Sequence, residues 1–117
     1  MEAKAEARYV RTSPQKARLV VSMIRGLKAG DARSALSVVN KRIAPAVLKV
    51  LDSAIANARN LDENVDPDRL YVSAAYVNEG PRLRRTRPAP MGRAYRYQRR
   101  MAHIIVKVAE KAGEREE

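Results

Sequence analysis

GPRLRRTRPAPMGRAYRYQRR, residues 80–100, sets the architecture of this chain. It holds eight arginines, three prolines and two tyrosines, with no lysine and no acidic residue. The flanking residues 69–79 and 99–109 are rich in Val, Ile and Tyr and are typical of β-strands. A hairpin turn usually takes two to five residues, whereas this connection has about twenty, and structureless loops of that length are uncommon in compact domains. The stretch therefore predicts a long extended β-hairpin arm.

The predicted arm turns near Met91. At about 3.3 Å per residue it would extend roughly 35 Å beyond the body of the protein. Pro81, Pro88 and Pro90 stiffen it, and because proline lacks a backbone N–H we expect no regular hydrogen-bonded ladder in its middle. A segment of this kind has little core of its own, so it predicts a partner that encloses it.

Residues 3–11 alternate small or apolar with charged or polar side chains. This period of two predicts a half-buried strand, with Ala3, Ala5, Ala7 and Tyr9 on the face toward the core. We expect this strand to pair with the long hairpin.

Three helices are predicted between the first strand and the hairpin. The first has Ser13 as N-cap and Pro14 at its first position, and Gly26 follows its last turn. The second begins at Asp31 as cap and ends at Asn40, and the third covers about residues 42–60, followed by an acidic loop. Apolar side chains recur at helical spacing in all three: Ala17, Val20, Val21, Ile24; Ala32, Ala35, Leu36, Val39; Ala44, Val47, Leu48, Leu51, Ile55, Ala58.

The expected fold class is α+β, a small three-stranded antiparallel sheet packed on three helices with the long β-hairpin arm. The chain has 117 residues, enough for one domain with a modest core. We expect a single domain over residues 1–117. Its globular body covers about 1–79 and 101–112, its basic arm 80–100, and its acidic C-terminal tail 110–117.

The composition excludes several classes of protein. There is no cysteine, so disulfides and thiolate metal sites are ruled out. The sequence also has neither an apolar run long enough to span a membrane nor a signal peptide, so we expect no membrane partner and no export. The one histidine, His103, lies in a predicted strand, where a structural role is the more common one. No phosphate-loop or dinucleotide motif occurs. We therefore expect no enzyme, no metal site and no cofactor, and a cytoplasmic location.

The net charge of +11 points instead to a polyanionic partner. The excess lies in residues 1–60 and in the arm, with acidic residues 61–79 between them. Every cation of the arm is arginine, whose planar fork binds phosphate in two places and stacks on bases. Tyr95 and Tyr97 flank Arg96, so aromatic rings can stack while arginine contacts the nucleic-acid backbone. The arm thus predicts binding to folded RNA.

The order of motifs is similar to that of one family. SPQKARLVVSMIRG, AIANA, VNEGPRLRRTRPAPMGRA and HIIVKV follow one another as in the bacterial large-subunit ribosomal protein twenty-two, and the resemblance covers about residues 3–109. The chain has Ala89, Pro90 and Met91 where the family commonly has a basic or small residue and an arginine before the Gly-Arg-Ala motif. It also has Met101 and Ala102 where the family tends to have Thr-Ser.

The resemblance implies a structural constituent of the large ribosomal subunit that binds several domains of its RNA and supports assembly. Its partners would be that RNA, neighbouring ribosomal proteins and the nascent peptide, because the family's hairpin lines the peptide exit tunnel. The tunnel-lining tip would be Pro90, Met91, Gly92 and Arg93. The arm residues expected to bind RNA phosphates are Arg82, Arg84, Arg85, Arg87, Arg93, Arg96, Arg99 and Arg100.

The basic residues of the N-terminal part predict a second RNA-binding face on the body. Its candidates are Lys4, Arg8, Arg11, Lys16, Arg18 and Arg25. The main alternative is an architectural DNA-binding protein with a basic β-arm, but such proteins are usually dimers and nothing here indicates a homo-oligomer. A membrane-active cationic protein is a further alternative, which would need a basic amphipathic helix in place of a proline-broken block.

Overall fold

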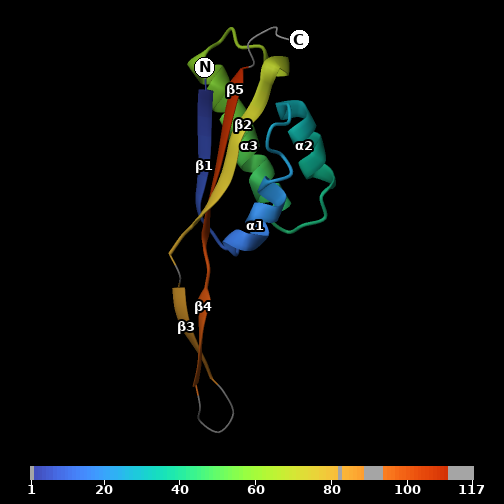
Figure 1. Cartoon of the computed structure of the whole chain (residues 1–117). Coiled ribbons are helices and arrows are strands. Elements are labelled where there is room, and N and C mark those ends of the chain that lie inside the picture. Colours follow the sequence, from blue (N-terminus) through green and yellow to red (C-terminus); the bar gives the residue numbers. More distant parts are fainter. Residues whose placement is uncertain (1, 82, 89–93, 111–117) are drawn as a thin grey trace.

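A three-stranded antiparallel sheet carries the helices and continues into a narrow two-stranded arm (Figure 1). The computed structural model describes residues 2–81, 83–88 and 94–110. For residues 83–88 and 94–99 it describes only the backbone. The elements in chain order are β1 (Glu2–Val10), α1 (Pro14–Val21), α2 (Ala29–Val38), α3 (Ala44–Leu61), the short 3-10 helix η1 (Pro67–Arg69), β2 (Leu70–Glu79), β3 (Leu83–Pro88), β4 (Ala94–Arg99) and β5 (Ala102–Glu110). The α+β class is confirmed.

The larger sheet has the strand order β1–β5–β2, with the last strand of the chain in the middle. Its helix-covered face carries Ala102, Ile104, Val106 and Val108 of β5, all completely buried. The predicted helix stripes meet this face: Ala17, Val20, Val21 and Ile24 are buried, as are Val47, Leu51 and Ala58 of α3. Burial of these aliphatic side chains, at about 25 cal/mol per Å² of apolar surface, is the main stabilising contribution to the body.

The first strand departs from its predicted alternation near its end. Ala3 and Ala5 are buried as expected, but Tyr9 is 58% exposed and has a φ of 60°. The pairing of β1 with β5 shifts between Ala7 and Val10, which is the mark of a β-bulge. The extra residue turns Tyr9 outward and lets Val10 pack against the core. The prediction that Tyr9 faces the core was wrong because simple alternation cannot register a bulge.

Two helix ends also differ from expectation. Ser13 caps α1 as predicted, its hydroxyl accepting the Lys16 backbone N–H at 3.3 Å, but the regular helix ends at Val21. The chain then turns through Gly26 at a φ of 78°, and the Gly26 N–H donates to the Val72 carbonyl of β2 at 3.0 Å. Helix α2 starts at Ala29, so Asp31 lies in its first turn and is not its cap.

The arm is a separate two-stranded sheet that pairs β3 with β4 in regular antiparallel register, from Leu83 opposite Arg99 to Pro88 opposite Ala94. Pro81 precedes this ladder and Pro88 ends it, so neither interrupts it. The middle of the stretch, where we expected no regular ladder, falls in residues 89–93, which lie outside the described residues. The predicted strand over residues 99–109 is also divided, since β4 ends at Arg99 and β5 begins at Ala102.

The molecule is long for its size. Its principal extents are 68 × 26 × 18 Å and its radius of gyration is 17.8 Å, against about 13 Å for a compact domain of this length. Figure 1 shows that the difference comes from the arm, which continues the line of the sheet away from the body.

Candidate nucleic-acid interface

The register of the arm brings cationic and aromatic positions opposite one another. Arg85 pairs with Tyr97 and Arg87 pairs with Tyr95, while Arg84 pairs with Gln98 and Arg96 with Thr86. The backbone register thus places arginine and tyrosine positions on facing strands, and these are residue types that contact phosphates and stack on bases in nucleic-acid-binding proteins. Arg82 and the predicted tip, Pro90, Met91, Gly92 and Arg93, lie outside the described residues, so their assignments stay predictions.

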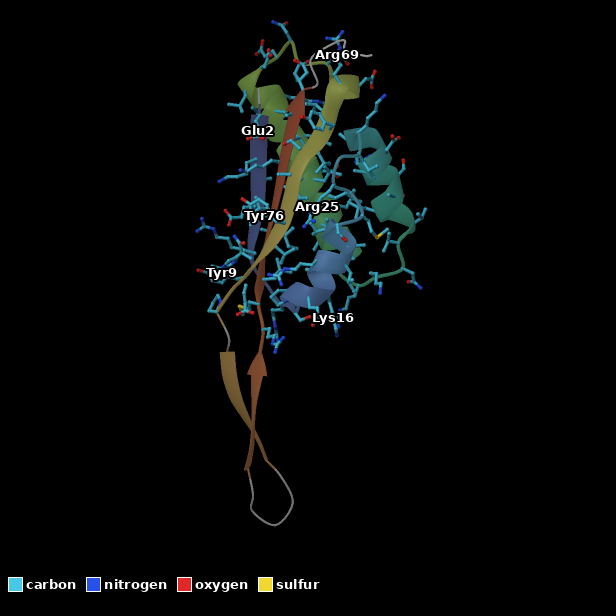
Figure 2. All side chains as sticks on the ribbon, in the orientation of Figure 1. Glu2, Tyr9, Lys16, Arg25, Arg69 and Tyr76 are labelled. Carbon is cyan, nitrogen blue, oxygen red and sulfur yellow. The ribbon has the colours of Figure 1, made fainter. Side chains whose placement is uncertain are left out.

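A concave surface of about 1100 Å³ lies where the arm leaves the body. We call it the junction groove. Figure 2 shows Lys16, one of its residues, at this end of the body. Four segments line the groove, namely the end of β1 with its following loop, α1, the entry to α3, and the link from β4 to β5. The lining residues are Val10, Arg11, Thr12, Ser13, Lys16, Leu19, Lys41, Arg42, Ile43, Ala46, Arg100 and Met101.

Five of the described lining residues are cations and none is acidic. The cations are Arg11, Lys16, Lys41, Arg42 and Arg100. Within the described part of the chain, no ion pair neutralises any of them. Like charges gathered on a concave surface raise the positive potential there and attract an anion.

A second groove on the body, of about 740 Å³, shows that such charge is not a general property of the surface. It lies between α2 and α3 and is lined by three cations, Lys28, Arg33 and Arg59, together with three aspartates, Asp31, Asp52 and Asp68. Arg33 Nε donates to Asp52 Oδ1 at 2.6 Å, and this hydrogen bond raises the pKa of the guanidinium. Cations and aspartates are equal in number in that groove, whereas the described lining of the junction groove has cations alone.

The body residues predicted to bind RNA divide into groups. Arg11 and Lys16 line the junction groove, together with Arg100 from the base of the arm. Lys4 and Arg8 lie on β1 outside it, and Arg8 forms an exposed ion pair with Glu6 at 3.4 Å. The structure thus brings three of the predicted residues together and leaves two on a separate strand surface.

Arg18 and Arg25 have partners within the protein. The Nε and Nη2 groups of Arg18 donate to the Val77 carbonyl at 3.3 and 3.1 Å, and Arg25 Nε donates to the Ala75 carbonyl at 2.6 Å. Both acceptors lie on β2, an edge strand of the sheet. These arginines therefore satisfy edge carbonyls and hold the α1 segment against the sheet, while their contact with RNA stays a prediction.

Lys41 and Arg42 are the groove residues that the sequence prediction missed. They are adjacent cations immediately before α3, and this dipeptide is the only signal that could have drawn attention to them. Nothing local relates them to Arg11 or Arg100, which are far away in the chain. The tertiary fold alone brings the four to one surface.

The root of the arm is built around His103. Its Nδ1 accepts the Tyr9 backbone N–H at 3.1 Å, and the two rings meet edge to face with centroids 5.0 Å apart. The Gly80 N–H donates to the Met101 carbonyl at 2.8 Å. A Cβ added to Gly80 would lie 3.2 Å from this carbonyl oxygen and 3.3 Å from the His103 imidazole, so glycine allows the close approach. His103 thus has the structural role that its sequence position predicted, and it joins the ends of β1, β2 and β5.

The described residues offer neither a metal site nor a membrane span. They include no group of three or more His, Cys, Asp or Glu side chains placed to hold a metal ion. In the same part of the chain, none of the helices combines the length and apolar character required to cross a bilayer.

Comparison with known proteins identifies a family. The family model of ribosomal protein L22p/L17e matches residues 5–109. A relative from Solibacter usitatus, named large ribosomal subunit protein uL22, is 70% identical over 111 residues, covering 95% of this chain and 98% of the relative. Proteins of the same name from Thermus thermophilus and Koribacter versatilis are 55% and 52% identical. Both alignments cover 97% of this chain. They cover 99% of the Thermus thermophilus protein and 70% of the Koribacter versatilis protein.

Proposed function

Because the chain belongs to the family of ribosomal protein L22p/L17e, we propose that it holds large-subunit ribosomal RNA with two basic surfaces, the arm and the junction groove. It is a structural component of the large ribosomal subunit, and it is not an enzyme. Its partners are ribosomal RNA and other ribosomal proteins, and its place is the bacterial cytoplasmic ribosome. The comparisons give the DNA-binding alternative no support.

The observation that carries the proposal is the junction groove at the root of an arginine-rich arm, whose described lining holds five cations and no acid. Arg100 belongs to both surfaces, so positive charge continues from the body onto the arm. Arginine forks bind phosphates bidentately, and a concave cationic surface suits the convex backbone of folded RNA. In this mechanism the groove anchors one RNA segment while the arm neutralises phosphates of others.

The finer assignments rest on the family resemblance. The arm arginines contact phosphates from several RNA domains, and the tip at Pro90, Met91, Gly92 and Arg93 lines the exit tunnel and meets the nascent peptide. The body contacts rest on charge and position rather than on the resemblance: Lys4 and Arg8 contribute a further RNA contact along β1. The chain acts as a single domain and as one copy, with the arm as an extension of the body.

The test is equilibrium binding of the full chain to transcribed large-subunit RNA over a series of salt concentrations. If the eight arm arginines each neutralise a phosphate, they alone contribute about −6 to −7 to the slope of the logarithm of the association constant against the logarithm of salt concentration, and the groove cations make the slope of the full chain steeper. Duplex DNA of equal length is the competitor. A flat salt response, or preference for the duplex, would overturn the proposal.

A further inference from the structure

We propose that the junction groove receives one unstacked nucleotide of ribosomal RNA, with the base on the apolar floor of the groove and the adjoining phosphates on its cationic rim. The inference rests on the proposed function and specifies what this one surface binds. We use floor for the apolar lining residues, Val10, Leu19, Ile43, Ala46 and Met101, and rim for the cationic lining residues, Arg11, Lys16, Lys41, Arg42 and Arg100.

The floor is the feature that simple phosphate binding leaves unexplained. Leu19 is 58% exposed although it is a large apolar side chain, and it lies one helical turn from Lys16 of the rim. Val10 and Ile43 are partly buried and pack against the core, which gives the floor a fixed support. A phosphate gains nothing from such a surface, because apolar side chains offer it neither charge nor hydrogen bonds.

A nucleobase has the chemistry that both parts of the groove require. Its flat faces bury apolar surface, and burying exposed Leu19 beneath one is favourable. In a regular A-form helix the bases are stacked inside and only the backbone and groove edges are accessible, so protein recognition of RNA commonly takes bases from loops and bulges. An unstacked nucleotide therefore offers an apolar face to the floor and two phosphates to the rim.

The charge of the rim distinguishes RNA from a protein partner. A groove with five cations and no described acid would need a strongly acidic protein segment, whereas RNA supplies one negative charge at every nucleotide. The groove between α2 and α3 has its cations balanced by aspartates, so it provides a control surface on the same molecule.

The experiment measures base reactivity in RNA with and without the full chain. The probe is transcribed large-subunit RNA of Thermus thermophilus, the source of a 55% identical relative. Base-modifying reagents report unpaired bases at single-nucleotide resolution. We expect a base that reacts in free RNA, is protected by the wild-type chain, and reacts again with Leu19→Ala, which should also bind about tenfold more weakly.

Matched variants separate the floor from the rim. Leu61→Ala makes the same change at a leucine that is 67% exposed on α3 outside the groove, and it should keep both affinity and protection. Arg42→Gln in the rim should reduce the steepness of the salt dependence by about 0.7 to 0.9, while Leu19→Ala should leave it unchanged. Arg59→Gln in the charge-balanced groove should leave it unchanged as well.

The outcomes separate this inference from the proposed function. Equal affinity and equal reactivity patterns for Leu19→Ala and Leu61→Ala would overturn the nucleotide site while RNA binding stands. Unchanged RNA binding by Leu19→Ala combined with poor incorporation into reconstituted subunits would assign the groove to a neighbouring protein, and would also overturn it. Failure of the wild-type chain to prefer this RNA over an unrelated RNA of equal length would refute both proposals.

Discussion

Replacing Arg18 with methionine should lower the stability of the body, whereas replacing Lys16 with methionine should not. The two cations lie two residues apart on α1 and are both exposed. Arg18 donates two hydrogen bonds to the Val77 carbonyl of β2, while within the described residues no side-chain partner is found for Lys16. Methionine keeps much of the apolar length of both side chains, so the variants differ in the hydrogen bonds they remove.

The magnitude follows from the geometry at Val77. Hydrogen bonds that involve a charged group contribute about 1.5 to 3 kcal/mol when well buried. Two donors share one acceptor here at 3.1 and 3.3 Å, and the bonds are only partly buried, so we expect a loss of about 1 to 2 kcal/mol. For a domain of this length the entropy of unfolding converts that loss into a decrease in Tm of about 4 to 8 °C.

The assay is thermal unfolding of both variants by circular dichroism, with RNA binding measured in parallel. Lys16→Met should unfold within about 1 °C of the wild-type chain and bind large-subunit RNA with a less steep salt dependence. Arg18→Lys, which keeps the charge but not the fork, should lie between Arg18→Met and the wild-type chain in Tm.

An unchanged Tm for Arg18→Met would refute this reasoning. It would mean that water replaces the guanidinium at the Val77 carbonyl without a net cost. If Arg18→Met instead weakened RNA binding to the same extent as Lys16→Met, Arg18 would belong to the interface.

Glycine substitutions should have opposite effects at two positions. Gly80→Ala should destabilise the body by about 1 kcal/mol, because its Cβ would press on the His103 ring and the Met101 carbonyl at the arm root. Gly30→Ala on α2 should stabilise the body by about 0.5 to 1 kcal/mol, since nothing lies within 4 Å of the added Cβ. Urea unfolding in which the two variants changed the free energy of unfolding in the same direction would contradict this. Leu51→Ala should cost about 3 kcal/mol by the same assay, because this α3 side chain is completely buried in the hydrophobic core. A cost below about 1 kcal/mol would show that the core closes the cavity.

Much of the body was predictable because its signals are local. Helical spacing identified the buried faces of α1 and α3, and Ser13 followed by Pro14 marked the start of α1. These patterns depend on 3.6 residues per turn and on unpaired N–H groups at a helix start, which are properties of a short segment. The arm was likewise predictable, since a connection that is too long for an ordinary turn and joins two strand patterns indicates an extended hairpin.

Departures from the prediction occur where distant segments meet. Tyr9 turns outward because the bulge in β1 accommodates a contact with His103 in β5. Helix α2 begins at Ala29 because Lys28 is still bridged to Tyr71 of β2, so a nearby acidic residue was a misleading start signal. Arg18 and Arg25 looked like surface charge, yet their acceptors are carbonyls of a strand more than forty residues later.

The sequence was sufficient to establish the class of fold, the arm and the polyanionic partner, because periodicity and charge density are properties of consecutive residues. Tertiary structure alone created the junction groove. Its cations come from four separate segments, and no interval along the chain predicts that Arg11, Arg42 and Arg100 will line the same surface. Their convergence depends on how the sheet, α1 and α3 pack around one aliphatic core, and packing of that kind is decided by contacts between residues far apart in sequence.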